Sequence, residues 1–283
     1  MFARIKQLIL RLTDRRPIIK CEVTALPKSD LLKGRIAIVT GGTSGIGFSI
    51  AEAFLNAGAC VIITGRNEER LQHACEDLKQ YGVCKGFVLD NTDVSSFEAT
   101  FQKMIAEVGK ISILVNNAGV NYPGIPNAKE EEYDRVLNTN LKGVFFLSQM
   151  IGKYMVDNEI KGNILNICSS SSLRPAISAY TVSKWGLRGL TLGLAKSLVG
   201  HGVVVNGLAP GAVATPMLHK GKDGDMTYPT SPIGRYIMPE EIANMAVFLV
   251  SNMGRSIVGD IVYMTGGMGV ITNDDINYNV FTK

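Results

Sequence analysis

The sequence predicts a doubly wound α/β protein whose single, mainly parallel sheet has seven strands and helices on both faces. From residue 35 onward, short β-branched runs alternate with longer helical patterns, and this alternation requires crossover connections between parallel strands. The strand candidates are almost wholly apolar, which is typical of a sheet covered on both sides. A glycine-rich turn also joins the first strand to the first helix, as is common in doubly wound sheets.

The predicted elements follow one another in a regular order. The strand candidates cover residues 35–40, 60–65, 84–90, 111–117, 162–168, 203–209 and 260–266. Helical patterns fill the intervals at 45–57, 67–80, 94–108, 130–156, 178–199 and 239–250. Since no linker, repeat or low-complexity tract interrupts this order, we expect one domain over residues 35–270. A basic amphipathic extension at 1–34 precedes it, and a tail at 271–283 follows.

The composition is typical of a soluble globular protein with one large core, because 46% of the 283 residues are hydrophobic and 19% are charged. The five cysteines are odd in number and show no Cys-x-x-Cys spacing. Cys60 and Cys168 fall within apolar strand candidates, where buried reduced thiols are expected. A reducing compartment, and hence the cytoplasm, fits this usage. The three histidines have no partner spacing, so we expect no metal site.

The net charge of +4 is concentrated at the N-terminus. Residues 1–34 hold eight basic and three acidic side chains, whereas the remainder holds 21 basic and 22 acidic ones. The body therefore has no basic excess that would indicate nucleic-acid binding.

Apolar residues recur at helical spacing within residues 1–16, but no apolar run there is long enough for a signal peptide or a membrane span. Docking of this segment on the protein's own body or on a sister subunit is the first interpretation. Peripheral membrane contact and a transit peptide are the alternatives.

The turn after the first strand candidate has the sequence TGGTSGIG, residues 40–47. A strand, a glycine-rich turn and a helix N-terminus together form a pyrophosphate site, because backbone N–H groups and the positive end of the helix dipole face the phosphates. Gly41 is expected to allow the tight turn, Gly45 the close approach of a phosphate, and Gly47 the close packing of helix on strand. The alternative is a purely structural turn.

Further motifs follow in order along the chain. They are LDNTD at 89–93, NNAG at 116–119, NTNLKG at 138–143, a serine-rich strand end at 169–172, YTVSK at 180–184 and APGAVATPM at 209–217. Together with the glycine-rich turn, their order and spacing resemble those of the short-chain dehydrogenase/reductase family from about residue 33 to residue 269. The resemblance implies a single Rossmann domain, a nicotinamide cofactor and an oxidoreductase activity.

The end of the second strand candidate favours NADP(H) over NAD(H), because the adenosine ribose lies there. Gly65 stands where an acidic residue would bind both ribose hydroxyls, and Arg66 follows it. An arginine clamps a 2′-phosphate and stacks on adenine. The alternative is that Arg66 is a solvated charge paired with Glu68 or Glu69. Ser44 departs from the pattern, since some NADP-using relatives carry a basic residue at this position.

The same resemblance implies further cofactor contacts. Asp90 accepts a hydrogen bond from the adenine amino group, Asn117 ties the fourth strand to its neighbours, the Val213 backbone holds the nicotinamide carboxamide, and Thr215 holds the diphosphate. The full set of implied cofactor-binding residues is Gly41, Thr43, Ser44, Gly45, Ile46, Gly47, Arg66, Asp90, Asn91, Asn117, Ala118, Gly119, Tyr180, Lys184, Pro210, Gly211, Val213 and Thr215.

Tyr180 and Lys184 are expected to perform the proton chemistry. They lie four residues apart in a helical pattern, so the phenol and the ammonium share one face. Hydride transfer to a carbonyl carbon leaves negative charge on the oxygen, which then needs a proton donor. An isolated phenol exchanges its proton readily only near pH 10, and a neighbouring ammonium favours the phenolate. The alternative is a core tyrosine over a surface lysine.

Ser169 and Asn140 complete the expected catalytic group by resemblance. Ser169 donates to the substrate oxygen, although relatives more often show a longer separation from the tyrosine; Ser170 and Ser171 remain alternatives. The carboxamide of Asn140 holds a water bonded to Lys184, which gives a proton path to solvent. Asparagine is a poor residue in mid-helix, so this position indicates a task or a local kink. Asn138 is the solvent-facing alternative.

The segment at 218–236 is long, polar and rich in glycine and proline, as a mobile substrate lid is. Four apolar or aromatic residues near it either line a substrate pocket or pack the lid on the body: Met217, Leu218, Met226 and Tyr228.

The resulting functional hypothesis is an NADPH-dependent reductase that converts a small-molecule carbonyl to a secondary alcohol, reversibly. A 3-oxoacyl-thioester reductase and a hydroxysteroid dehydrogenase are alternatives within this class, because the lid rather than the fold selects the substrate. A non-catalytic nucleotide-binding protein is the alternative from another class. The family also implies a homo-oligomer, a dimer or a tetramer, with the helices at 130–156 and 178–199 as candidate interface.

Overall fold

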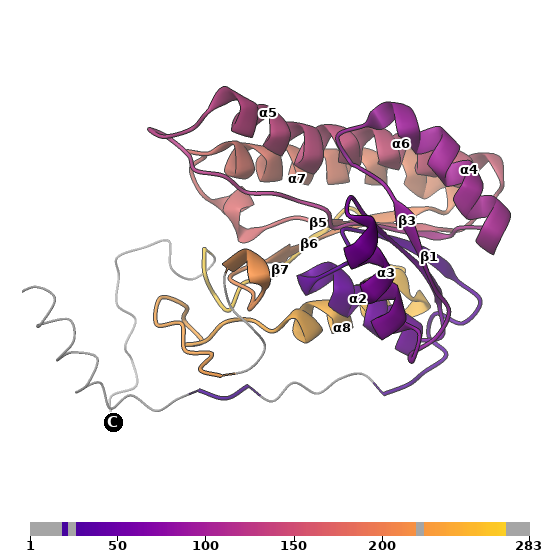
Figure 1. Ribbon diagram of the computed structural model, residues 1–283, viewed down its shortest axis with the longest axis horizontal. Coiled ribbons are helices and arrows are strands. Elements are labelled where there is room, and N and C mark those ends of the chain that lie inside the picture. The colour runs from indigo at the N-terminus through magenta and orange to yellow at the C-terminus, as the bar shows by residue number, and fades with distance from the viewer. Residues whose placement is uncertain (1–18, 22–26, 219–223, 270–283) are drawn as a thin grey trace, which may run out of the picture.

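The computed structural model describes residues 19–21, 27–218 and 224–269, and a seven-stranded sheet runs through the middle of the molecule (Figure 1). The strand order is β3-β2-β1-β4-β5-β6-β7, and every neighbouring pair is parallel. The sheet is therefore parallel throughout, where the sequence predicted a mainly parallel one. The strands are β1 (Ile36–Thr40), β2 (Cys60–Gly65), β3 (Cys84–Val88), β4 (Ile113–Asn116), β5 (Asn163–Ile167), β6 (Val204–Pro210) and β7 (Ile261–Met264).

Helices cover both faces of this sheet, as the apolar strands predicted (Figure 1). One face carries α2 (Gly45–Asn56), α3 (Glu68–Leu78) and α8 (Pro239–Val250). The other carries α4 (Phe97–Val108), α5 (Glu130–Leu137), α6 (Gly143–Asp157) and α7 (Ala179–Leu198). All seven strands and the predicted helical patterns thus have counterparts in the structure.

Alternate residues along each strand enter two separate cores. Val39, Val115 and Leu165 join the cluster that α2 and α8 cover, whereas Ile38 and Leu114 join the cluster under α4 and α6. These side chains are all at most 1% exposed. Burial of both faces explains why the strand sequences lack the polar alternation of a half-exposed sheet.

The helical pattern predicted at 130–156 is divided by a wider turn. Between α5 and α6 the five residues Asn138–Lys142 form a π-helical turn, η2, which the Gly143 N–H closes on the Asn138 carbonyl. Such turns are rare and are frequent at functional sites. The kink suggested by a mid-helix asparagine is therefore this π-turn, which contains Asn140.

Packing with the domain begins before residue 35. Leu32 is fully buried in the α2 and α8 core, and its N–H donates to the Ala57 carbonyl at the end of α2. The Met226 N–H donates to the Ile19 carbonyl, and Cys21 packs beside Met226 and Met238. The amphipathic stretch 1–16 and the tail 271–283 lie outside the described residues.

An ion pair fixes the loop that leads from the lid into α8. Arg235 donates to both carboxylate oxygens of Glu241, over 2.8 and 2.9 Å. The same carboxylate accepts from the N–H of Met238, the residue before the helix, at 2.8 Å. The Glu241 carboxylate therefore caps the N-terminus of α8 and binds Arg235 at the same time. Both side chains are about a quarter exposed.

Within the described ranges 19–21, 27–218 and 224–269, no helix is both long and apolar enough to cross a bilayer. The same residues contain no group of three or more His, Cys, Asp or Glu side chains arranged to hold a metal.

Replacing Glu241 tests the role of its ion pair with Arg235. The hydrogen bonds from Arg235 hold the pKa of Glu241 below its ordinary value of 4.5, so its stabilisation is present above pH 4.5 and is lost as the pH falls through the lower folded-state pKa. Glu241→Gln is expected to lower the free energy of unfolding by about 1 kcal/mol at neutral pH. Urea denaturation at neutral and acidic pH measures the difference, which should shrink in acid.

A double-mutant cycle with Arg235→Gln supplies the control, because residues that act through one ion pair are not additive. A Glu241→Gln deficit of equal size at both pH values, or full additivity, would contradict the assignment.

Candidate active site

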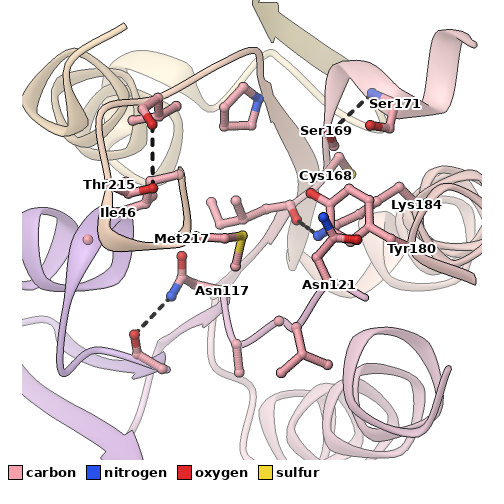
Figure 2. Close-up of a pocket in the computed structure, with 18 of the residues that line it drawn as sticks. Ile46, Asn117, Asn121, Cys168, Ser169, Ser171, Tyr180, Lys184, Thr215 and Met217 are labelled. Carbon is pink, nitrogen blue, oxygen red and sulfur yellow. Dashed lines mark hydrogen bonds between the residues drawn. The ribbon is translucent and has the colours of Figure 1, made fainter. Parts of the chain in front are cut away.

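A cleft of about 640 Å³ lies at the carboxyl ends of the strands, where the loops after β1 to β6 meet. Its size is typical of a small-molecule site. The strand order reverses between β1 and β4, and ligands of doubly wound sheets bind in the crevice at this point. Figure 2 shows side chains from both halves of the sheet directed into this space.

The first part of the cleft is the turn between β1 and α2. Gly41 and Gly45 have φ values of 64° and 57°, in the left-handed region that favours glycine. Ser44, the N-cap of α2, makes no side-chain cap hydrogen bond. Since the first N–H groups of a helix lack intrahelical acceptors, the N-terminus of α2 presents donors and the positive dipole end to the cleft.

Gly47 acts differently from the other glycines, because it does not line the cleft. A Cβ atom at Gly47 would collide with Asn117 Nδ2 and the Gly41 carbonyl. The Asn117 amide nitrogen in turn donates to the carbonyl oxygens of Thr40 and Gly41, over 2.9 and 3.1 Å. Asn117 therefore ties the end of β4 to the end of β1, and Gly47 lets α2 approach this junction.

Arg66, which follows β2, lines one end of the cleft and is exposed. Among the described residues it has no ion pair, so the alternative pairing with Glu68 or Glu69 is not seen. A Cβ atom at Gly65 would lie 2.9 Å from Thr43 Cγ2. An acidic residue at Gly65 would therefore require Thr43 to move.

Asp90 and Asn91 line the same end. One oxygen of Asp90 accepts from the N–H and the hydroxyl of Thr92, both at 2.9 Å. Asn91 is 4% exposed, and its buried amide nitrogen has no hydrogen-bond partner among the described residues. Because an unpaired buried donor is costly, an acceptor atom of a ligand in the cleft would satisfy this group.

Tyr180 and Lys184 face the cleft from the first turns of α7 (Figure 2). Lys184 is 5% exposed, and its Nζ donates to the Ile167 carbonyl at 2.7 Å and lies 5.6 Å from the centre of the Tyr180 ring. Lys184 is thus not a surface lysine, which removes the alternative of a core tyrosine beside a solvated charge.

A chain of buried amides fixes α7 relative to the sheet. Asn116 donates to the side-chain oxygens of Asn166 and Ser148, over 2.8 and 2.9 Å. Asn166 in turn donates to Thr191 Oγ1 of α7 at 2.9 Å. Buried networks of this kind select one packing arrangement, and this one connects β4, β5, α6 and the helix that carries Lys184.

Three of the four consecutive serines line the cleft: Ser169, Ser170 and Ser171. Ser172 is fully buried and donates to the Ser169 carbonyl at 2.8 Å. Ser169 Oγ accepts from the Ser171 N–H at 3.1 Å, which orients the oxygen and leaves its own hydrogen available.

Asn140 lies behind the cleft rather than in its lining, and is 1% exposed. Its carboxamide accepts from the Val120 N–H and donates to the Val120 carbonyl, both at 2.9 Å, and donates to Ser183 Oγ at 3.3 Å. Both donor hydrogens are therefore used within the protein. The expected water can therefore bind this carboxamide only at the second lone pair of its oxygen.

Cys168, between Ile167 and Ser169, also lines the cleft. Burial raises the pKa of this thiol to about 11, so it stays protonated at neutral pH and is a poor nucleophile. This agrees with the buried, reduced thiol expected at Cys168, whereas Cys60, for which the same was expected, is only partly buried.

The loop after β6 closes the cleft over α2. Pro210, Gly211, Val213 and Thr215 all line it. Val213 forms a parallel bridge with Ile237, and the Thr215 side chain lies close to Gly45. The lid residues divide between the two expected roles. Met217 and Tyr228 line the cleft, whereas Met226 is 2% exposed and packs on the body; the Leu218 side chain lies outside the described residues.

Sequence reasoning missed several lining residues. Four of them fall between the motifs: Asn121, Arg174, Ser178 and Met268. Thr139 and Thr181 lie within motifs but were given no role. Sequence reasoning also missed the role of Thr40, whose hydroxyl accepts from the N–H groups of Asn117 and Ala118, both at 3.0 Å. The position of Thr40 immediately before the glycine-rich turn was the available signal.

Comparison with known proteins gives the family. Residues 35–225 match the short chain dehydrogenase family. The 3-oxoacyl-[acyl-carrier-protein] reductase FabG of Thermotoga maritima is 34% identical over 84% of this chain and 98% of its own. The 3alpha-hydroxysteroid dehydrogenase of Mediterraneibacter gnavus is 35% identical over 83% and 97%. The chain belongs to the short-chain dehydrogenase/reductase family and is an oxidoreductase of that family.

A solved structure extends the likeness to three dimensions. The 3-ketoacyl-(acyl-carrier-protein) reductase of Brucella melitensis, complexed with NADH, matches with a TM-score of 0.77 and 27% identity, covering 84% of this chain and 100% of that one. The family binds a nicotinamide cofactor. The open donors of α2 and the unpartnered Asn91 amide fit the phosphates and the adenosine of such a group.

Substituting Gly47 tests the close contact between α2 and the ends of β1 and β4. Gly47→Ala places a methyl group against Asn117 and Gly41, so α2 must shift and cofactor affinity is expected to fall by roughly 10-fold or more. Titration with NADPH, together with thermal unfolding, measures both effects.

Gly200→Ala is the matched control, because nothing lies within 4 Å of the added atom and this residue is outside the cleft, in the short turn Val199–His201. This control should bind cofactor normally and unfold at about the same temperature as the wild-type protein. Equal cofactor affinity in the two variants would show that α2 does not need its close approach.

Proposed function

We propose that this protein is an NADPH-dependent reductase that converts a small-molecule carbonyl to a secondary alcohol and also catalyses the reverse reaction. The observation that supports this most strongly is the arrangement of Tyr180, buried Lys184 and Ser169 in one cleft. A phenol, an ammonium and a hydroxyl here surround a space that is open to a substrate oxygen.

The phosphate end of the cleft supports the cofactor assignment. Backbone donors of residues 44–47 suit the pyrophosphate, and the free oxygen of Asp90 and the Asn91 amide suit the adenine. Arg66, which has no ion pair among the described residues, is placed to bind a 2′-phosphate through charge-assisted hydrogen bonds. NADP(H) is therefore favoured over NAD(H).

Each catalytic side chain has a separate task. When bound, the nicotinamide ring supplies or accepts the hydride. Tyr180 donates its phenolic proton to the carbonyl oxygen, and Ser169 donates a hydrogen bond to the same oxygen. Lys184 holds a positive charge 5.6 Å from the centre of the Tyr180 ring, which opposes the negative charge that remains on the phenol oxygen. A water on the Asn140 carboxamide oxygen would return the proton from solvent.

Exposed apolar side chains on the outer helices support an assembly of identical subunits. Phe145, Trp185 and Leu192 are between 43 and 49% exposed on α6 and α7. Such surface area is typical of an interface, so we include a homo-oligomer, a dimer or a tetramer, in the proposal. The cysteine usage favours a reducing compartment, so we also include a cytoplasmic location. A 3-oxoacyl thioester and a hydroxysteroid, named in two relatives, belong to the same reaction class.

Replacing the phenol tests the mechanism. Tyr180→Phe removes the proton donor but leaves the phosphate end intact, so NADPH should still bind while carbonyl reduction falls by roughly 10²- to 10⁴-fold. Steady-state reduction of a carbonyl panel and a separate NADPH titration measure the two properties.

Tyr154→Phe is the control, because this hydroxyl lies on α6 outside the cleft. Full turnover by Tyr180→Phe would exclude the phenol as the acid. Loss of NADPH binding in that variant would show a structural effect instead.

A further inference from the structure

We infer that Arg174 binds an oxyanion of the substrate, so that the preferred substrate is a carbonyl compound bearing a carboxylate or a phosphate. Arg174 lies in the loop between β5 and α7, beside Ser169–Ser171, and lines the cleft. None of the motifs that predicted the cofactor and catalytic residues includes it.

The location of Arg174 separates it from the adenosine end of the cleft, where Arg66 would bind the 2′-phosphate. Arg66 and Asp90 follow β2 and β3, whereas Arg174 follows β5. In the strand order, β5 is three positions from β2, which corresponds to roughly 14 Å at the usual strand spacing. Arg174 therefore lies at the substrate end, in the loop that carries Ser169 and leads to Tyr180.

The backbone of Arg174 is fixed while its guanidinium is free. Its N–H donates to the Ser171 carbonyl at 3.2 Å, and its carbonyl accepts from Trp185 Nε1 at 2.8 Å. Across residues 19–21, 27–218 and 224–269, its side chain has no hydrogen bond or ion pair. Arg174 is exposed, and a guanidinium at a cleft wall whose donors have no partner among the described residues suits bidentate binding of an oxyanion.

The charged side chains that line the substrate end of the cleft are positive. Of the described residues that line the cleft, the charged ones are Arg66, Asp90, Arg174 and Lys184. The only acid, Asp90, lies at the adenosine end. The N-terminus of the 20-residue helix α7 also opens here, since Ser178, Tyr180 and Thr181 line the cleft, and its dipole adds positive potential.

Figure 2 shows the polar groups that would accompany the anion. Asn121 and Ser171 both line the cleft and lie on the side opposite Thr215 and Ile46. These neutral groups can donate to the substrate without opposing a negative charge. A substrate that places its carbonyl at Tyr180 and its anion at Arg174 would use both.

The test compares matched pairs that differ only in charge. One arm uses oxo acids of increasing chain length and their methyl esters, and the other uses dihydroxyacetone phosphate and dihydroxyacetone, so the two arms distinguish a carboxylate from a phosphate. The first readout is kcat/KM with NADPH. We expect the wild-type protein to prefer the anion of at least one pair by roughly 10- to 100-fold.

Arg174→Gln should bring the ratio of kcat/KM for the anionic and neutral substrates close to one. Arg174→Lys should restore part of the ratio, because lysine keeps the positive charge but lacks the paired N–H donors of the guanidinium. Arg135→Gln is the matched control, since Arg135 is exposed on α5 and does not line the cleft. It makes the same change in net charge and should keep the wild-type ratio.

A second readout does not need turnover. Trp185 is the only tryptophan in the sequence and contacts the Arg174 carbonyl, so its fluorescence reports binding of each probe in the presence of NADP⁺, with which an oxo compound cannot react. Anions should bind the wild-type protein more tightly than their neutral partners, and Arg174→Gln should remove the difference.

Because the inference rests on the proposed reductase function, the two can fail separately. Turnover of esters in preference to acids, an anion preference that survives Arg174→Gln, or equal binding of charged and neutral probes would overturn the role of Arg174 alone. Absence of NADPH binding and of any reduction would overturn the proposed function, and the fluorescence titration of the protein without cofactor would then decide the role of Arg174.

Discussion

The site depends on the close contact between the first turn of α2 and the ends of β1 and β4. Asn117 holds the two strand ends together through the carbonyl oxygens of Thr40 and Gly41. The Thr40 hydroxyl accepts from two consecutive N–H groups of the β4 end. Gly47 has no side chain to prevent α2 from reaching this junction. The backbone donors of the turn therefore face the crevice where the strand order reverses.

A second set of buried polar contacts places the chemistry opposite this turn. The amides of Asn116 and Asn166 connect β4 and β5 to α6 and α7. Asn140, in the π-turn, fixes the Val120 backbone at the cleft wall. Polar groups buried in this way are costly unless they are paired. Although Asn116 Oδ1 has no partner among the described residues, the hydrogen bonds that the amides make favour one position of α7 and hence of Tyr180 and Lys184.

The fold followed closely from the sequence, because apolar strands and glycine-rich turns are local signals. The period of the pattern predicted the helix at 130–156 but not its π-turn, since a turn that is wider by one residue hardly changes hydrophobic spacing. The motifs also predicted residues whose function depends on backbone geometry, such as Gly41 and Gly45. They placed Asn140 in the site, whereas the structure puts it behind the cleft wall.

Contacts between distant loops were not predictable in the same way. The lid residues could line the cleft or pack on the body, and only the fold separates Met217 and Tyr228 from Met226. Arg174 gave no periodic or motif signal. Its importance comes from the fixed backbone, the open guanidinium and the absence of acidic neighbours among the described lining residues at that end.

The central claim is that this cleft binds NADPH with Arg66 on the 2′-phosphate. The most direct measurement is a titration of the protein with NADPH and with NADH, followed through energy transfer from Trp185, which lies one residue after Lys184. Binding of NADPH should be roughly 10- to 100-fold tighter than that of NADH, and Arg66→Gln should reduce this ratio. Tighter binding of NADH would contradict the assignment of Arg66, and binding of neither would contradict the account of the cleft as a nicotinamide cofactor site.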